Sequence, residues 1–411
     1  MAEVRAFAAV RYDHHRLEGD LSNVIAPPYD VLDEQDKKAL LARSDRNIVA
    51  IDLPHIPPKS AGPPELYEAS ARRLAQWLED GTLVRESQPA FYLYHQVFEH
   101  AGRTYTRRKF IAGVRLVPFS EGTVLPHEET FGGPKEDRLA LTRATRCNMS
   151  PVFGLYTDPD DEVGRAFAAT AARKPDMVAR MDGVENRVWI ATDPGVIKAV
   201  TATMAPKRIF IADGHHRYGT GLNYRNHVAE ETGGISEDHP ANFVMLVLGS
   251  MDDPGSLILP YNRVLLGPDA SIEKLTRAWS KGCGPTDGAS ADLVLYGGAD
   301  GAERPLQFID RTELKRLEPE HSEAWCSLDA AYLHRYLIEE LAQSLELTVR
   351  YVKSADDARA VARDENGVAL LLNATRMEQL RAVSECGELM PQKSTYFYPK
   401  LATGLTINPL S

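Results

Sequence analysis

The residues of this sequence best suited to chemistry are the run DGHHR at positions 213–217, which places an acid, two imidazoles and a guanidinium side by side. Residues 208–212 before it are apolar and predict a short buried strand, and a helical pattern covers residues 218–231 after it. A strand that ends in a glycine turn and opens a helix leaves the first helical N–H groups unpaired. This arrangement predicts an anion site at residues 213–217.

Each side chain of the run has a conceivable role there. Gly214 would let a phosphate approach the backbone closely, and Arg217 would add positive charge. His215 or His216 could carry a proton or hold an anion, and Asp213 could act as a base or bind a cation. The alternative is structural: an aspartate that caps the helix, followed by two exposed histidines.

A second group of alternating acids and bases lies on a glycine-rich loop that opens a helix. Such a loop could fold over a phosphate, with Lys135 and Arg138 as clamps. Glu128 or Asp137 would then lie near a metal ion or a hydroxyl group. A solvated charged loop is the alternative.

Two further segments could form the walls of a pocket. Residues 390–400 (MPQKSTYFYPK) combine lysines, hydroxyls and aromatic rings, unless they are only an edge strand with flanking lysines. Residues 26–30 (APPYD) form a stiff turn, because each proline fixes φ and lacks a donor; a plain turn is the alternative. The side chains of interest are Lys393, Ser394, Tyr396, Lys400, Tyr29 and Asp30.

Composition excludes several classes of protein. The 411 residues carry 47 Lys+Arg against 58 Asp+Glu, a formal net charge of −11, which opposes nonspecific binding to nucleic acid. Four cysteines without a CxxC pair are too few for a disulfide framework and suit a reducing cytoplasm. The N-terminus lacks an apolar signal-peptide core, and the best apolar run, Phe243–Leu248, is too short to span a membrane. The sequence contains no P-loop, no GxGxxG after a strand, no HExxH and no GxSxG.

The elements expected to position these residues alternate between strands and helices, so the fold class is α+β or mixed α/β. We expect two domains, 1–265 and 266–411, in which the second closes the pocket of the first. Expected strands are Arg5–Val10, Ala90–Val97, Tyr105–Val117, Val152–Tyr156, Arg187–Thr192, Arg208–Ala212 and Phe243–Leu248. Expected helices include Glu34–Ala42, Glu65–Asp80, Asp137–Cys147, Glu162–Lys174 and Gly195–Thr203.

Taken together, these segments resemble one family, the bacterial and archaeal domain-of-unknown-function family 1015 (DUF1015). The matching segments, in order, are APPYDVL (26–32), PHEET followed by KEDRLAL (126–141), NMSPVFGLY (148–156), IADGHHRY (211–218), LPYNR (259–263) and PQKSTYFYPKL (391–401). The resemblance covers nearly the whole chain. One departure is Asn262, where the family pattern has a histidine.

The DGHHR run also resembles the signature of the ParB/sulfiredoxin superfamily, whose members bind nucleotide phosphates on such a turn and include a free-serine kinase. This second resemblance implies a ParB/sulfiredoxin-like core elaborated by additional α/β segments. Sulfiredoxin chemistry needs a cysteine where this chain has His215, and ParB needs a DNA-reading helix that we do not find. The kinase pattern is the most similar to residues 213–217.

These observations favour a small-molecule kinase that transfers a phosphoryl group from ATP, ADP or pyrophosphate to a hydroxyl, with free L-serine the favoured acceptor. The alternative is a ParB-like nucleotide-binding regulatory protein without turnover. We expect a cytoplasmic protein that can form a homodimer, with Mg²⁺ and with neither nucleic-acid nor membrane partners. The expected roles are catalytic for Asp213, His215, Arg217 and Glu128; phosphate-binding for Gly214, His216, Lys135, Arg138, Lys393 and Lys400; substrate-binding for Tyr29, Asp30, Ser394 and Tyr396; and metal-binding for Asp137.

Overall fold

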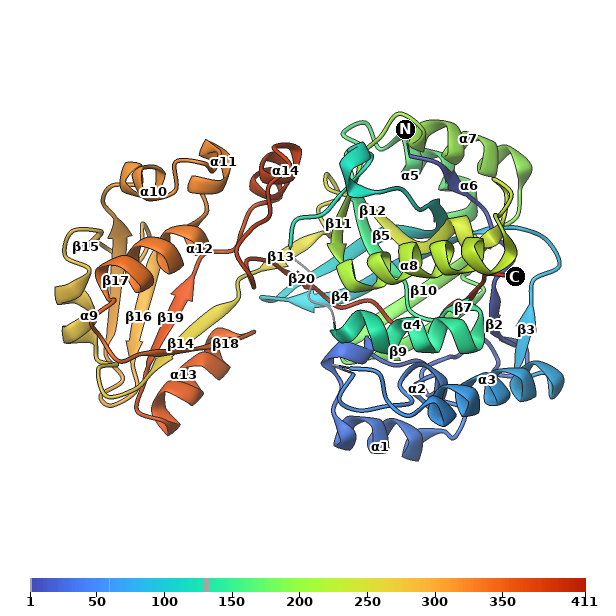
Figure 1. Cartoon of the computed structure of the whole chain (residues 1–411), viewed down its shortest axis with the longest axis horizontal. Coiled ribbons are helices and arrows are strands. Elements are labelled where there is room, and N and C mark those ends of the chain that lie inside the picture. The colour runs from blue at the N-terminus through green and yellow to red at the C-terminus, as the bar shows by residue number, and fades with distance from the viewer. Residues whose placement is uncertain (1, 59, 129–132) are drawn as a thin grey trace. The chain divides into compact units, whose positions relative to one another are not determined.

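The computed structural model describes residues 2–58, 60–128 and 133–411, and the contacts within it divide the chain into two compact units (Figure 1). The first unit comprises Met1–Pro126, Thr130–Ser256 and Pro399–Ser411, and the second comprises His127–Glu129 and Leu257–Tyr398. The domain boundary expected at residues 265 and 266 falls inside strand β14 (Asn262–Leu266) of the second unit. The segment Pro399–Ser411 belongs with the first unit, not with the residues that directly precede it.

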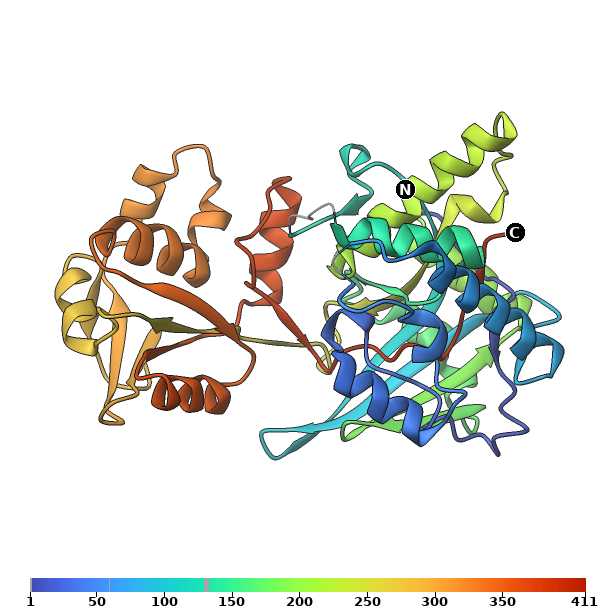
Figure 2. The ribbon, with the colours of Figure 1, turned by 60° about the horizontal axis from the view of Figure 1, so that its bottom comes forward.

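The first unit is built on a nine-stranded sheet of order β6-β11-β8-β12-β5-β4-β10-β9, with β1 beside β5. The pairs β6–β11 and β8–β12 are parallel and their neighbours antiparallel, so the sheet is mixed and the expected fold class is confirmed. Figure 2 shows the long β4–β5 hairpin, in cyan, projecting from this unit. The strands are β1 (Val4–Arg5), β4 (Phe91–His100), β5 (Arg103–Arg115), β6 (Val124–Leu125), β8 (Val152–Tyr156), β9 (Met177–Met181), β10 (Val184–Ala191), β11 (Ile209–Asp213) and β12 (Phe243–Ser250).

Helices cover this sheet, and two small strand pairs complete the unit. The apolar core lies between one face of the sheet and helices α5 to α7, where Leu246 and Phe110 pack with Val163, Phe167 and Val200. The helical segments are η1 (Tyr29–Val31), α1 (Glu34–Arg43), α2 (Val49–Asp52), α3 (Pro64–Glu79), η2 (Phe119–Glu121), α4 (Gly133–Thr145), α5 (Glu162–Ala166), α6 (Ala168–Ala171), α7 (Pro194–Met204), α8 (His215–Thr232) and η3 (Pro240–Asn242). The small pairs are β2 (Val10–Tyr12) with β3 (Leu83–Arg85), and β7 (Cys147–Asn148) with β21 (Asn408–Pro409).

The opposite face of the sheet carries polar side chains, because successive residues of a strand point to opposite faces. The segment that follows Tyr398 runs along this face. The Gln96 amide donates to the carbonyl of Lys400 at 3.0 Å, and the Arg107 guanidinium donates to the carbonyl of Pro399. Both side chains are fully buried. The segment is therefore held in place by buried hydrogen bonds from the central strands.

The second unit contains a separate six-stranded sheet of order β15-β17-β16-β19-β14-β18. Helix α13 packs on it through Ala358 and Ala362, which meet Val264 and Ala369. The strands of the second unit as a whole are β13 (Leu257–Leu259), β14, β15 (Cys283–Pro285), β16 (Leu293–Gly297), β17 (Glu303–Phe308), β18 (Thr348–Val352), β19 (Val368–Leu372) and β20 (Tyr396–Tyr398). Its helices are α9 (Ile272–Ala278), α10 (Thr312–Leu317), α11 (Glu323–Cys326), α12 (Asp329–Ala331), the π-helical η4 (Tyr332–Leu341), α13 (Ala355–Asp364) and α14 (Met377–Glu385). Among the described helices of both units, none combines the length and apolar character that a membrane crossing requires.

Most expected elements of the first unit are present, and two need correction. Residues 5–10 do not form one strand, because Val4–Arg5 pairs with β5 whereas Val10–Tyr12 pairs with β3, so the chain must bend between them. The single helix expected over 162–174 is instead α5 and α6, which meet at Phe167. Phe167 is buried in the core, and its backbone departs from helical values at φ −88° and ψ 0°.

Candidate active site

The DGHHR run lies where strand β11 meets helix α8, as the sequence predicts, but the helix begins earlier than expected. Asp213 is the last residue of β11, Gly214 caps the helix, and His215 opens it. The alternative in which an aspartate caps the helix is therefore wrong. It also required exposed histidines, whereas His215 is buried. The site thus starts at the junction of a central strand and a helix of the first unit.

Gly214 is required at this junction for two reasons. Its φ of +90° lies in the left-handed region, which favours glycine. A Cβ built on it would also lie 2.8 Å from Nε of Arg217. The guanidinium of Arg217 therefore folds back over the turn, against the backbone of Gly214.

Replacement of Gly214 by alanine should lower the free energy of unfolding by more than about 1 to 2 kcal/mol, the usual cost of left-handed backbone for a residue with a Cβ. The excess arises because the new methyl group meets Arg217. Gly233→Ala at the other end of α8 is the matched control: its φ is +72°, and its Cβ would meet nothing within 4 Å. Urea unfolding of both variants measures the difference, and equal losses would contradict the predicted contact with Arg217.

Asp213 is the centre of a three-member ion-pair group. Nζ of Lys400 donates to its Oδ2 at 2.6 Å, and Arg217 donates to its Oδ1 at 3.1 Å. Arg217 also donates to the carbonyl of Pro151. Burial alone would raise the pKa of Asp213, but the charges of Lys400 and Arg217 outweigh it and hold the pKa well below its ordinary value. Asp213 is thus a permanent anion that orients two cations, and it is poorly suited to accept a proton.

This depressed pKa predicts how stability depends on pH. In the unfolded chain Asp213 titrates near pH 4, and in the folded chain it titrates lower. Its ion pairs therefore stabilise the fold fully above about pH 4, and this stabilisation is lost as the pH falls towards the folded-state pKa. The difference in free energy of unfolding between the wild type and Asp213→Asn should be constant at higher pH and shrink below pH 4 in urea titrations. A difference that grows on acidification would contradict the assignment.

A second buried group surrounds Arg138 of helix α4. Its Nη2 and Nε donate to Oδ2 of Asp137 at 2.5 and 2.8 Å, and its Nη1 donates to the carbonyl of Asp52 at 2.6 Å. The guanidinium also lies over the ring of Tyr29, with its carbon 4.0 Å from the ring centre. Arg138 is buried, so it holds three chain segments together. Its predicted role as a free phosphate clamp does not fit, because its donors already have protein partners.

Asp137 does not fit its predicted role at a metal site either. It is fully buried, and both of its carboxylate oxygens are occupied: Oδ1 accepts from the Tyr67 hydroxyl at 2.7 Å, and Oδ2 accepts from Arg138. In the part of the chain that the structure describes, no three His, Cys, Asp or Glu side chains are grouped as metal ligands.

Asp52, which no sequence pattern singled out, links the two groups. Its Oδ2 accepts from the Ser150 hydroxyl at 2.7 Å, and burial raises its pKa. Asp52, Ser150, Arg138 and Arg217 all line one small cavity of about 30 Å³, enough for a water molecule or two. The signal that could have found Asp52 is a lone carboxylate within the apolar run NIVAIDL (47–53).

The exposed side of this site carries further charges. Burial by itself lowers the pKa of Arg217, but Asp213, Asp30 and the other nearby groups raise it overall. Asp30 is exposed, so it brings a negative charge to the mouth of the site. Lys135 lies across the first turns of α8: a Cβ on Gly219 would meet its Cε at 3.2 Å. Lys135 is half-buried.

Tyr29 lies under the guanidinium of Arg138, and its role as a substrate contact stays a prediction. It is buried in η1, and burial raises the pKa of its hydroxyl to about 12. Tyr29 therefore remains a neutral ring under a guanidinium.

His216 is half-buried in the first turn of α8, and its carbonyl accepts from the Thr220 hydroxyl at 2.9 Å.

The other predicted site residues belong to the second unit: Glu128, Lys393, Ser394 and Tyr396. Ser394 donates to the carbonyl of Pro391 at 2.5 Å, and the ring of Tyr396 lies 5.4 Å from that of Tyr261. The backbone carbonyl of Lys393 accepts from Arg263, a buried residue of the LPYNR segment. These contacts are internal to the second unit, so a meeting of these four residues with Asp213 stays a prediction.

The fold and this site define a mixed α/β protein whose first unit buries a network of paired carboxylates and cations at a strand–helix junction. The chain belongs to the family described as Protein of unknown function (DUF1015), which matches residues 4–331. This confirms the resemblance to DUF1015 for the segments from APPYDVL (26–32) to LPYNR (259–263), whereas PQKSTYFYPKL (391–401) lies outside the matched residues. The resemblance to the ParB/sulfiredoxin superfamily stays a prediction.

Several solved structures are similar to the chain at low identity. A conserved hypothetical protein from Pyrococcus furiosus is 13% identical with a TM-score of 0.33, and the match covers 69% of this chain and 91% of that one. A variant of free serine kinase in complex with ADP is 12% identical with a TM-score of 0.33, covering 69% and 90%. SbnI with C-terminal truncation from Staphylococcus aureus is 14% identical with a TM-score of 0.37, covering 72% and 87%. No curated protein matches the sequence.

Proposed function

We propose that this protein transfers a phosphoryl group from a nucleotide or pyrophosphate to the hydroxyl of a small molecule, with free L-serine as the favoured acceptor. The observation that supports this most is the placement of Arg217, Lys400 and Lys135 around the first turns of helix α8. Phosphoryl transfer depends chiefly on positioning and on neutralising the charge of the phosphate oxygens. Three cations beside the open N–H groups of a helix N-terminus supply both.

The carboxylate of Asp213 explains how these cations are held ready. It anchors Arg217 and Lys400 in fixed positions before any phosphate arrives, so little ordering is needed on binding. Both cations are partly or largely buried, which strengthens their attraction for an incoming anion. A phosphate group would bind as a second anionic partner of both cations, while Asp213 keeps them in position.

The acceptor side of the proposal rests on different residues. Asp30 and Tyr29 would contact the acceptor from the stiff APPYD turn, and Asp30 is exposed and close enough to Arg217 to interact with it electrostatically. An exposed carboxylate suits the ammonium group of a free amino acid. Glu128 is proposed as the general base, and Lys393, Ser394 and Tyr396 as further contacts, all from the second unit.

The test is phosphorus NMR of the purified chain with L-serine and Mg²⁺, and with ATP, ADP or pyrophosphate in separate samples. A new phosphomonoester signal that depends on serine is expected, and the sample that produces it names the donor. D-serine and L-alanine are the control acceptors, since L-alanine lacks the hydroxyl. Omission of Mg²⁺ shows whether the donor must be its magnesium complex. Donor binding without any new signal would overturn the kinase proposal for serine and favour a nucleotide-binding regulatory protein.

A further inference from the structure

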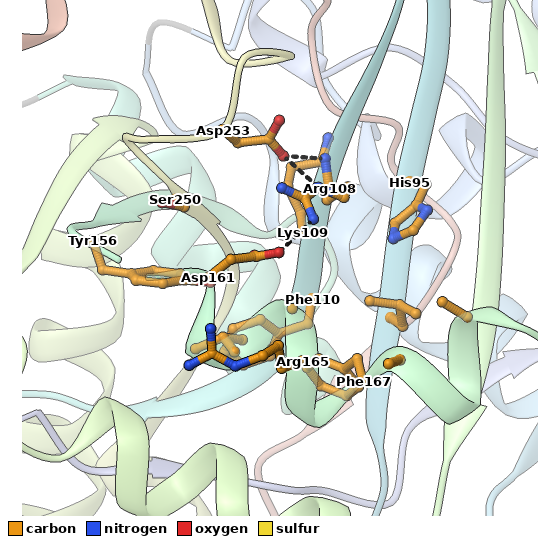
Figure 3. A pocket seen from close by; sticks show the side chains of 15 residues that line it. His95, Arg108, Lys109, Phe110, Tyr156, Asp161, Arg165, Phe167, Ser250 and Asp253 are labelled. Carbon is orange, nitrogen blue, oxygen red and sulfur yellow. Dashed lines mark hydrogen bonds and ion pairs between the residues drawn. The ribbon is translucent and has the colours of Figure 1, made fainter. Parts of the chain in front are cut away.

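A second cavity of the first unit, of about 310 Å³, lies away from the DGHHR run, between the sheet and helices α5 and α6 (Figure 3). Its apolar lining comes from Leu93 and Phe110 on the sheet and from Val163 and Phe167 of the helical segment. Small-molecule sites are commonly apolar clefts that begin at about this volume. The size suits a metabolite as small as an amino acid.

This cavity is on the opposite face of the sheet from the polar side chains that hold the segment after Tyr398. His95 and Arg108 face each other on β4 and β5 and line the cavity. Their chain neighbours Gln96 and Arg107 point to the other face, where they bond to Lys400 and Pro399. A ligand in this cavity would therefore be separated from Asp213 by the sheet.

The rim of the cavity carries a group of three charges. Figure 3 shows Arg108 between Asp253 and Asp161, joined to both by dashed lines. Its Nη1 lies 2.9 Å from Oδ2 of Asp161, its Nε lies 3.5 Å from Oδ2 of Asp253, and its backbone N–H donates to the same Asp253 oxygen at 2.8 Å. Two carboxylates share one guanidinium, so the group carries one net negative charge. Asp161 is 48% exposed at its side chain, so it can accept a further cation.

Two further polar groups of the lining, Arg165 and His95, set the charge of the rim. Arg165 lines the same cavity, is exposed, and donates to the carbonyl of Asp160. Burial, together with the charges of Lys109 and Arg108, lowers the pKa of His95 to about 4, so this imidazole is neutral at physiological pH. The rim thus presents a negative group at Asp161 and a positive one at Arg165, above an apolar floor.

We propose that this cavity binds a zwitterionic amino acid with an apolar side chain. Its ammonium would meet the carboxylate of Asp161, its carboxylate would meet the guanidinium of Arg165, and its side chain would pack on Leu93, Phe110 and Phe167. L-serine lacks the apolar group that this floor requires, so the site is separate from the acceptor site proposed above. Occupation by a leucine-like or phenylalanine-like molecule would make it an effector site on the far side of the sheet.

Isothermal titration calorimetry of the full chain with L-leucine and L-phenylalanine tests this inference. Saturable binding of one of them is expected. Phenethylamine, which keeps the ammonium, should bind more weakly, and hydrocinnamate, which lacks it, should lose at least about tenfold in affinity. Absence of binding by both amino acids at millimolar concentration would overturn the proposal, as would hydrocinnamate binding as tightly as L-phenylalanine.

Two variants locate the binding. Ala171→Trp fills the cavity and should weaken binding at least about tenfold, whereas Ala169→Trp, two residues away, exposed and outside the lining, should leave it unchanged. Asp161→Asn should also weaken binding about tenfold; asparagine tolerates the left-handed φ of +50° found there, so the fold is retained. Unchanged affinity in both Ala171→Trp and Asp161→Asn would overturn the assignment to this cavity. Because these readouts measure binding only, they are independent of whether the chain is a kinase.

Discussion

Arg217→Met is expected to reduce phosphoryl transfer by about 10²- to 10³-fold, the usual effect of removing one fixed donor to a developing negative charge. The physical reason is that Arg217 is held over Gly214 by Asp213 and by the carbonyl of Pro151, so its charge is fixed at the helix N-terminus. Methionine retains much of the side-chain volume but no charge. The measurement is the rate of phosphomonoester formation with the donor found by phosphorus NMR.

The control for this variant is Arg225→Gln on the same helix. Arg225 donates to the carbonyl of Leu116 and lies outside the ion-pair group of Asp213, so transfer should proceed at the wild-type rate. Because Arg217 is buried, thermal unfolding must show that Arg217→Met is folded at the assay temperature. A folded Arg217→Met variant with wild-type turnover would refute a role for Arg217 at the transferring phosphate.

Arg138→Met should destabilise the first unit by about 3 to 5 kcal/mol, because it leaves the buried carboxylates of Asp52 and Asp137 without their cation. Bulk water cannot take the place of the lost guanidinium beside these carboxylates, since Arg138 is only 5% exposed. Its contact with the ring of Tyr29 would be lost as well. Urea unfolding followed by tryptophan fluorescence measures the loss.

Arg143→Met on the same helix α4 is the matched control. Arg143 is exposed, so its replacement should change the free energy of unfolding by no more than about 0.5 kcal/mol. Adding Asp52→Asn to Arg138→Met should restore part of the lost stability, because it removes one of the two unpaired charges. A double variant less stable than Arg138→Met alone would contradict the view that unpaired charge causes the loss.

The sequence predicts those elements whose residues follow a regular pattern. Helix α3 has its apolar residues on one face and is found within a residue of the predicted range. The β4–β5 hairpin and strand β8 are likewise confirmed, the latter with its predicted ends. Where one segment pairs with two different partners, as Val4–Arg5 and Val10–Tyr12 do, no local pattern reveals the bend between them.

The site was predicted only in part, for a related reason. The DGHHR run is recognisable because four functional side chains fall within five consecutive residues. Asp52 is part of the same site, but it reaches Ser150 across 98 positions and Arg138 across 86. The Tyr67 hydroxyl donates to Asp137 from 70 positions away in the sequence. The carboxylate expected to bind a metal ion therefore accepts hydrogen bonds from Tyr67 and Arg138 instead. Pairings at such separations are set by the packing of the whole unit.

The position of Lys400 in the chain has a consequence for the order in which the first unit assembles. Asp213 and Lys400 belong to the same unit, yet the main segment of the second unit, Leu257–Tyr398, lies between them in the sequence. Closing a flexible loop of that length costs about 4 kcal/mol of entropy. Within the second unit, Leu257 at the start of β13 pairs with Tyr398 at the end of β20, so its folding brings the two ends of the insertion together. Folding of the second unit thereby offsets most of this entropic cost before Lys400 reaches Asp213. Because synthesis proceeds from the N-terminus, Lys400 joins the ion-pair group of Asp213 late. This step depends on the folding of the second unit, although that unit contributes neither Arg217 nor Lys400.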